Sequence, residues 1–306
     1  MEIKKRILLI INPVSGRREI LNKLSQIIDK FCKNGCLPTL AFTQKRGDAH
    51  RLAQTCPPDY DAVVCAGGDG TLNEVIGGLM AGGVNLPLGY LPVGTTNDLA
   101  NSLGIPKNVL SAVDLILNST PVLLDIGSFS GRYFNYVASF GAFTEASYNA
   151  PQEVKNILGH AAYILEGIKS LGSIRRCRVR FEFNGQQLED DYIFGAVTNT
   201  TSLGGLIKLK QHLVALNDGV FELLLIRYPE NLQQLNKIIG DLLAQNFSGE
   251  YIKMYHTAKI KVTASGEMNW TLDGEKQPGA PEIFIENIPH AIRFFAATPN
   301  ANKNKQ

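Results

Sequence analysis

The chain has 306 residues, of which 44% are hydrophobic and 19% charged, a composition typical of a soluble globular protein with room for two domains. A formal net charge of only +2 does not favour nucleic acid as the main partner. The five cysteines are odd in number and form no Cys-x-x-Cys pair, which indicates free thiols in a reducing cytoplasm. No apolar run approaches the roughly 20 residues of a membrane span.

The first part of the chain alternates predicted strands and helices. Short apolar runs predict buried strands at residues 7–11, 37–43, 61–65 and 88–91. Apolar residues at helical spacing, and a helix-opening turn at residues 47–49, predict helices at residues 20–31, 50–54 and 72–80. This alternation implies a parallel sheet. Ligands bind such sheets beyond the C-terminal ends of the strands, where the special turns of this chain fall.

The most informative of these turns is Ala-Gly-Gly-Asp-Gly-Thr-Leu-Asn-Glu at residues 66–74, a strand–turn–helix corner. Three glycines in four positions let the backbone bend tightly and let an anion approach the main chain. The helix N-terminus behind them offers free N–H groups that suit phosphate. Asp69 would repel a phosphate unless a divalent metal bridges the two. A capping role alone would explain Asp69, but not the second glycine pair and the threonine.

The second part of the chain is rich in strands, which predicts a β-sandwich. Residues 177–183 alternate apolar and polar side chains, and Asn184-Gly185 then indicates a two-residue hairpin turn. The further strand candidates of this part are residues 133–143, 192–198, 220–226, 258–263, 268–272, 282–286 and 291–297, whereas residues 121–125 are expected as the last strand of the first part. Two helical segments, residues 154–171 and 232–247, interrupt the strands.

The corner resembles the nucleotide loop of the diacylglycerol kinase catalytic domain, which sphingosine and ceramide kinases share. Gly-Gly-Asp-Gly-Thr at residues 67–71 carries the likeness, and bacterial soluble lipid kinases are similar in length and layout. The resemblance implies a doubly wound three-layer α/β ATP-binding domain, followed by a β-sandwich domain. The implied domains are residues 1–127 with 291–299 and residues 128–290, before a disordered tail at residues 300–306.

The same resemblance implies the ATP contacts. Asn-Pro-Val-Ser-Gly at residues 12–16 is similar to the first nucleotide loop of the family, and Gly-Thr-Thr-Asn-Asp-Leu-Ala at residues 94–100 to a later element. By itself, the Asn-Pro-Val-Ser-Gly sequence would be a common turn. Thr43 matches a nucleotide contact of the family, but a threonine at the end of a strand explains it nearly as well. The implied contacts are Asn12, Pro13, Ser15, Gly16, Thr43, Gly67, Gly68, Asp69, Gly70, Thr71, Leu72, Asn73 and Thr95.

Metal sites are implied in the same way. In the family, aspartates at the places of Asp69, Asp98 and Asp125 work around Mg²⁺, and Asp125 is expected to end the last strand of the first domain. Asp98 alone would also suit a helix cap. A structural Mg²⁺ is implied at a second place, although a hairpin turn explains that sequence equally well. Its implied ligands are the side chain of Asp218 and the carbonyls of Ala215 and Val220.

Leu-Asp-Gly-Glu at residues 272–275 resembles a late motif of the family that carries the catalytic base. One carboxylate accepts the proton of the substrate hydroxyl and the other holds its orientation. The family usually gives the base role to the residue at the place of Glu275, but the sequence does not separate Glu275 from Asp273. Alone, a strand followed by Asp-Gly predicts a hairpin turn.

The function implied is a Mg²⁺-dependent lipid kinase that transfers the γ-phosphoryl group of ATP to a lipid alcohol such as diacylglycerol. It is expected to be cytoplasmic and to visit the membrane surface transiently, with residues 154–171 as a docking candidate. The lipid is not fixed, and a homodimer stays open. NAD kinase, which phosphorylates the ribose 2′-hydroxyl of NAD, is the alternative, but it lacks the Asn-Pro-x-Ser-Gly opening and the late Asp-Gly-Glu. A third alternative is a lipid- or nucleotide-binding protein without catalytic activity. The acidic residues of the late motif argue against it, because a pure binding protein has no need of a proton acceptor.

Overall fold

The computed structural model of the chain describes residues 5–95, 97–142, 175–200, 202–203, 207–208, 215–264, 266 and 268–297. The chain forms two compact units: unit 1, Met1–Leu124 with His290–Gln306, and unit 2, Asp125–Pro289. The predicted helix at residues 154–171 and the predicted tail at residues 300–306 lie outside the described residues. Among the described helices, none is both long enough and apolar enough to cross a membrane.

Unit 1 is built on a parallel sheet that contains β1 (Lys5–Ile11), β2 (Cys36–Phe42), β3 (Ala62–Gly67), β4 (Leu88–Pro92) and the end of β17 (Glu282–Phe294). The strand order is β17-β4-β3-β1-β2. β1 pairs in parallel with both β2 and β3, and β4 pairs in parallel with β3. All residues of β3 and β4 are buried, as expected when both faces of a sheet are covered.

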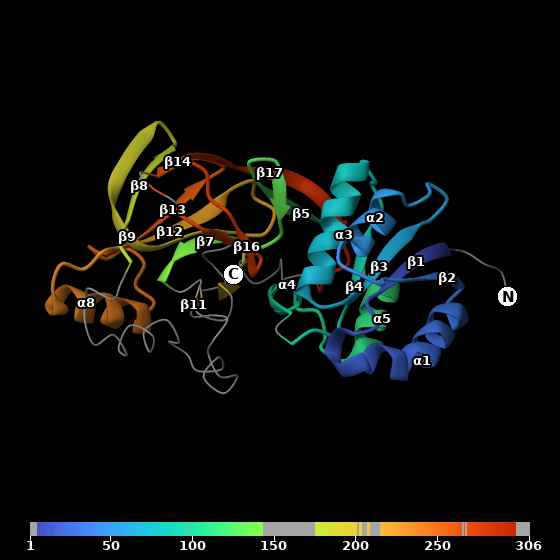
Figure 1. The fold of residues 1–306 in the computed structure, drawn as a ribbon. Coiled ribbons are helices and arrows are strands. Elements are labelled where there is room, and N and C mark those ends of the chain that lie inside the picture. The colour runs from blue at the N-terminus through green and yellow to red at the C-terminus, as the bar shows by residue number, and fades with distance from the viewer. Residues whose placement is uncertain are drawn as a thin grey trace, which may run out of the picture. The chain divides into compact units, whose positions relative to one another are not determined.

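The helices of unit 1 are α1 (Glu19–Lys33), α2 (Asp48–Gln54), α3 (Asp69–Gly82), α4 (Asp98–Ser102) and α5 (Val109–Asn118), with a 3-10 turn η1 (Ser15–Arg18). α1 and α5 lie on one face of the sheet, and α2 and α3 lie on the other (Figure 1). The chain therefore changes face between β1 and β3, which is the topological switch point of a doubly wound sheet. The predicted three-layer α/β architecture is confirmed.

Helices α2 and α3 pack closely because α3 has glycines at the contact. A Cβ added at Gly78 would lie 2.2 Å from the carbonyl oxygen of His50, and one added at Gly82 would lie 2.4 Å from that of Gln54. Because a backbone carbonyl cannot move aside cheaply, each glycine is needed for this helix pair.

We expect Gly78→Ala to lower the free energy of unfolding by about 1–3 kcal/mol, because α2 must shift to admit the methyl group. Chemical denaturation measures this. Gly240→Ala is a matched control, since an added Cβ there meets nothing within 4 Å. That control should raise stability slightly, by about 0.5–1 kcal/mol, because alanine favours a helix. Equal effects of the two substitutions would contradict the packing explanation.

Unit 2 is an antiparallel β-structure with one described helix, α8 (Leu232–Leu243). Its strands are β5 (Val122–Phe129), β6 (Arg132–Phe134), β7 (Val137–Gly141), β8 (Cys177–Phe183), β9 (Gln186–Thr198), β10 (Ser202–Leu203), β11 (Ile207–Lys208), β12 (Phe221–Arg227), β13 (Ile252–Thr257), β14 (Lys259–Ala264), β15 (Trp270–Leu272) and β16 (Glu275–Gln277). The main path is β16-β15-β7-β9-β8-β14-β17, with β12 between β9 and β13 and with β5 beside β6 and β17. The predicted β-sandwich is confirmed.

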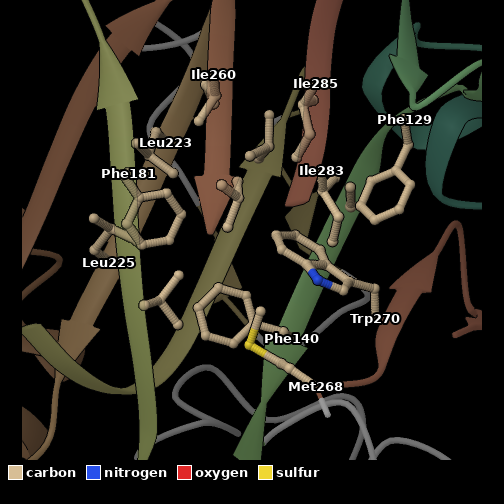
Figure 2. Packing of buried hydrophobic residues seen from close by; sticks show 14 of the residues in the cluster. Phe129, Phe140, Phe181, Leu223, Leu225, Ile260, Met268, Trp270, Ile283 and Ile285 are labelled. Carbon is tan, nitrogen blue, oxygen red and sulfur yellow. The ribbon is translucent and has the colours of Figure 1, made fainter. Parts of the chain in front are cut away.

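The core of unit 2 is rich in aromatic rings (Figure 2). Trp270 packs against Phe129 and Phe140, with ring centroids 5.1 and 4.9 Å apart. β8 contributes alternate side chains to this core, including Phe181, and exposes the others. Since β15 carries Trp270, the strand that precedes the Asp-Gly turn is anchored in the centre of the core.

Two strand predictions in unit 2 need correction. The predicted strand at residues 133–143 is two strands, β6 and β7, because the N–H groups of Asn135 and Tyr136 donate to the carboxylate of Asp273 instead of to a neighbouring strand. The strand predicted to end at Asp125 continues to Phe129, because its last residues pair with β6 in a hairpin.

The last strand also differs from the prediction. Residues 282–286 and 291–297 were expected as two strands, but they belong to one strand, β17. Its alternation of buried and exposed residues is interrupted near Pro289, which has no N–H group, and His290, whose φ is 54°. Before this point β17 pairs with β14 in unit 2, and its end pairs with β4 in unit 1.

Candidate active site

The loops that follow β1, β3 and β4 meet at the switch point of unit 1, and glycines allow their close approach. A Cβ added at Gly16 would lie 2.0 Å from the carbonyl oxygen of Val93, and one added at Gly94 would lie 2.6 Å from the Cα of Gly68. Gly16 also has a φ of 57°, which other residues rarely adopt. The structure thus brings together the three loops that the sequence predicted to contact ATP.

Asn12 connects the first loop to the corner. Its N–H donates to the carbonyl of Ala66 at 2.9 Å, and its side-chain Nδ2 donates to Thr71 Oγ1 at 3.0 Å. Asn12 Oδ1 accepts the N–H of Val14 at 3.1 Å, which shapes the turn that carries Ser15. Two predicted ATP contacts, Asn12 and Thr71, therefore hold the two loops together through a hydrogen bond of their own.

The corner itself begins α3 directly after the glycine pair. Gly68 is extended, and α3 starts at Asp69, so the N–H groups of its first turn have no partner within the helix. The predicted ATP contact Leu72 has a side chain that is only 1% exposed and belongs to the core. Leu72 can therefore contribute only its backbone to a ligand, whereas Gly70 is exposed.

Asp69 lies against the start of α4. Burial raises the pKa of its carboxyl, and hydrogen bonds from the N–H groups of Asp98 and Asn97 oppose that shift. Among the described residues, Asp69 Oδ1 is buried and has no hydrogen-bond partner. A buried carboxylate oxygen without a donor is costly, so a cation or its bound water would satisfy it.

Asn97 fixes the loop that carries Thr95 and Asp98. Its φ is 51°, its Oδ1 accepts both the Tyr90 hydroxyl and the Gly94 N–H at 3.0 Å, and its Nδ2 donates to the Gly94 carbonyl at 2.8 Å. Asp98 is buried and Thr95 is exposed. The sequence analysis did not single out Asn97 or Tyr90. The available signal was that asparagine adopts a left-handed φ more readily than most residues.

Thr43 follows β2 at the same edge of the sheet. Its N–H donates to the carbonyl of Ile11 at 2.9 Å. The loop beyond it is fastened to α3, because Glu74 Oε1 accepts the N–H of Gly47 at 2.9 Å. The N–H groups of Gln44 and Lys45 hold the pKa of the Asp48 carboxyl below its usual range. The sequence analysis did not assign a role to Glu74, whose hydrogen bond with Gly47 holds this loop against α3.

Asp125 belongs to unit 2, whereas Asp69 and Asp98 belong to unit 1. Its Oδ2 accepts the N–H of Gly219 at 2.7 Å, so it lies at the turn predicted to hold a structural metal. In that turn, Asp218 Oδ1 accepts the N–H of Val220 at 3.1 Å. Within the described part of the chain, no three acidic, histidine or cysteine side chains gather as a metal-binding group. Both metal assignments stay predictions.

Asp273 and Gly274 form the two-residue turn between β15 and β16, with φ values of 48° and 85°. The Asp273 side chain is buried and accepts three backbone hydrogen bonds, from Asn135 at 2.6 Å and from Tyr136 and Val137 at 3.0 Å each. Its carboxylate therefore holds the segment between β6 and β7.

Glu275 has different surroundings, although only one residue separates it from Asp273. Its side chain is 33% exposed, and its Oε2 accepts a hydrogen bond from Arg132 Nη2 at 3.0 Å. The two acidic residues of the late motif thus differ in burial and in partners: Asp273 is buried and bonded to backbone N–H groups, whereas Glu275 is partly exposed and bonded to an arginine side chain.

We expect Asp273→Ala to lower the free energy of unfolding by on the order of 3 kcal/mol or more, because buried N–H groups lose their acceptor. Chemical denaturation of the full-length variant tests this. Asp273→Asn should lose less, since it keeps one acceptor oxygen. An alanine variant as stable as the parent would show that water replaces the carboxylate at no cost.

An α/β unit and a β-sandwich unit with these elements have the fold class of the NAD kinases and diacylglycerol kinases. Residues 6–129 match the family described as diacylglycerol kinase catalytic domain. Residues 137–296 match the family described as YegS C-terminal NAD kinase beta sandwich-like domain. The chain belongs to the diacylglycerol kinase family, which confirms the predicted enzyme class, a lipid kinase. Membership of a kinase family implies ATP as the co-substrate.

Similar proteins cover nearly the whole chain. The chain is 35% identical to the diacylglycerol kinase of Bacillus subtilis over 94% of its own length and 95% of that protein. It is 33% identical to the diacylglycerol kinase of Staphylococcus saprophyticus over 99% of both chains. A crystal structure of a putative diacylglycerol kinase from Bacillus anthracis matches with a TM-score of 0.79, covers 97% of both chains at 24% identity, and supports the fold.

Proposed function

We propose that the protein transfers the γ-phosphoryl group of ATP to the hydroxyl of diacylglycerol in a Mg²⁺-dependent reaction. The observation that carries this proposal is the meeting of three glycine-containing loops at the N-terminus of α3. This arrangement occurs in a chain whose relatives over nearly their full length are named diacylglycerol kinases.

The phosphates of ATP are proposed to bind at the start of α3. There the free N–H groups and the positive end of the helix dipole favour an anion. Gly16, Gly68 and Gly94 let the three loops pack against one another at this point, and the exposed Gly70 leaves the main chain of the first turn accessible to a phosphate. Asn12, which already bonds the corner, and the exposed Thr95 supply polar groups beside it.

A divalent cation fits Asp69, because its buried Oδ1 has no hydrogen-bond partner among the described residues and Mg²⁺ prefers carboxylate oxygens. We propose that Asp69 and Asp98 hold it, directly or through water. When bound, Mg²⁺ neutralises the charge that develops on the transferred group. For the turn at Asp218 we keep the structural Mg²⁺ as a second proposal, in which Asp125 shapes the turn through Gly219.

Glu275 is proposed as the catalytic base. Its carboxylate is partly exposed, whereas that of Asp273 is buried and accepts three backbone N–H groups. The proton of the lipid hydroxyl passes to the Glu275 carboxylate while the hydroxyl oxygen bonds to the γ-phosphorus and ADP leaves. Asp273 then acts by fixing the turn that presents Glu275.

The test is incubation of the full-length protein with radiolabelled ATP, Mg²⁺ and an acceptor in mixed micelles. The acceptors are diacylglycerol, phosphatidylglycerol, a sphingoid base and an isoprenoid alcohol, with NAD as a soluble acceptor. We expect the fastest labelling with diacylglycerol. Preferred labelling of another lipid would overturn the assigned acceptor, and labelling of NAD alone would overturn the lipid kinase proposal in favour of NAD kinase.

We also propose that the protein binds membrane surfaces reversibly, because diacylglycerol stays in the bilayer and the enzyme must reach it there. The full-length protein is expected to sediment with vesicles that contain phosphatidylglycerol, and high salt should weaken this binding because salt screens charge. Vesicles of phosphatidylcholine alone are the control. Absence of binding to either vesicle at every salt concentration would count against a bilayer-resident acceptor.

A further inference from the structure

Arg132 contacts two side chains of β16 at once. Its Nη2 donates to Glu275 Oε2 at 3.0 Å, and its Nη1 donates to Gln277 Oε1 at 2.5 Å. Glu275 and Gln277 lie on the same face of β16, because side chains alternate along a strand. The rigid fork of the guanidinium group therefore spans both acceptors.

A tight hairpin places Arg132. The turn between β5 and β6 consists of Ser130 and Gly131, with φ values of 47° and 89°, and Arg132 pairs with Phe129 directly after it. The Ser130 N–H donates to the carbonyl of Phe284 at 2.7 Å, and Ser130 Oγ accepts the Phe284 N–H at 3.2 Å. The hairpin that carries Arg132 is therefore bound to β17 and has little freedom to move.

The late motif is thus held in two ways. Asp273 fixes the backbone of its turn through three buried hydrogen bonds. The Glu275 side chain extends beyond that turn and has several rotatable bonds, so a fixed backbone alone leaves several rotamers open. Arg132, presented by a second fixed hairpin, bonds the Glu275 carboxylate in one of them.

We propose that Arg132 is a positioning residue that orients the Glu275 carboxylate for proton transfer, an inference that rests on the proposed role of Glu275 as the base. A general base works only within hydrogen-bond reach of the proton that it takes, and a third group commonly orients it. A purely structural ion pair at an exposed site contributes little to stability and has no reason to affect turnover. The two roles therefore differ in what they predict for kinetics.

The variants are Arg132→Ala, Arg132→Lys and the matched control Arg180→Ala. Arg180 pairs with Glu189 in the same unit, with side chains 45% and 36% exposed, compared with 42% and 33% for Arg132 and Glu275. We expect Arg132→Ala to lower kcat roughly 10- to 100-fold, as a misplaced catalytic group does. The KM for ATP and the unfolding midpoint should change no more than in the control. Arg132→Lys should restore part of kcat.

Glu275→Gln and the double variant Arg132→Ala with Glu275→Gln complete the experiment. On the Glu275→Gln background, loss of Arg132 should cost no further activity, and a further loss of the same factor would overturn the positioning role. If Glu275→Gln is inactive but Arg132→Ala behaves like Arg180→Ala, the positioning role is wrong and the proposed function stands. If Glu275→Gln stays active, the base assignment fails, and the inference fails with it.

Discussion

Replacement of Asp69 by alanine is expected to lower lipid phosphorylation by on the order of 10³-fold or more, the usual effect of removing an electrostatic element from a transfer site. Asp69 lies at the first residue of α3, where the phosphates of ATP are proposed to bind. Its carboxylate repels the phosphates unless a cation lies between them. A neutral side chain at this position cannot hold that cation, so it cannot replace the function of Asp69. The measurement is kcat with saturating ATP and Mg²⁺ in the micellar assay.

Two further variants separate charge from structure. Asp69→Asn keeps the shape and an acceptor for the N–H groups at the start of α4, and it should be nearly as inactive as the alanine variant. Asp29→Ala removes an exposed carboxylate that pairs with Lys33 on α1 and should leave kcat unchanged. Near-normal turnover of Asp69→Ala would mean that the nucleotide site has been misplaced.

Glu275→Gln is expected to lower kcat by about 10²–10⁴-fold, the contribution of a positioned general base, while ATP affinity stays nearly constant. Glutamine has nearly the same shape and still offers Arg132 an acceptor oxygen, but it cannot take a proton. ATP affinity should hold because the proposed nucleotide contacts all belong to unit 1, whereas Glu275 belongs to unit 2. Nucleotide binding and lipid turnover are measured on the same preparation.

Glu189→Gln is the matched control, because Glu189 pairs with Arg180 at similar exposure in the same unit. It should retain full turnover. Asp273→Asn tests the other carboxylate of the motif. If that variant were inactive but stably folded, with Glu275→Gln substantially active, Asp273 would be the base and the three N–H donors around it would have to release it during the reaction.

The sequence predicted the fold well wherever a local pattern decides the structure. β8 has the predicted bounds, because its alternation is regular and Asn184-Gly185 forms the expected turn with φ values of 49° and 71°. β16 was not predicted, because it is a short polar strand that exists only through its pairing with β15. β17 looked like two strands because Pro289 and the left-handed His290 interrupt the pattern, although strand pairing continues on both sides of them.

The candidate site also contains residues that a local sequence pattern predicts and residues that it does not. The glycine loops carry their signal in adjacent residues, and the structure brings them together as expected. Partners far apart in the chain leave no such signal. Nothing near Glu275 in the sequence points to Arg132, and nothing near Gly47 points to Glu74. Asp125 looked like the end of an α/β strand, whereas its contact with Gly219 depends on how the second unit folds.

The path of β17 affects how unit 1 folds during synthesis of the chain and how its gene segment can be exchanged. Phe294 pairs with Leu88, and the N–H of Ala297 donates to the carbonyl of Leu103, so the nucleotide-binding unit takes its last strand from the end of the chain. While the ribosome is still making unit 2, β4 remains an open sheet edge that invites pairing with other chains. The gene cannot be cut after Leu124 to yield a complete first unit. Exchange of the first unit between genes must therefore carry the C-terminal segment from His290 onward as well.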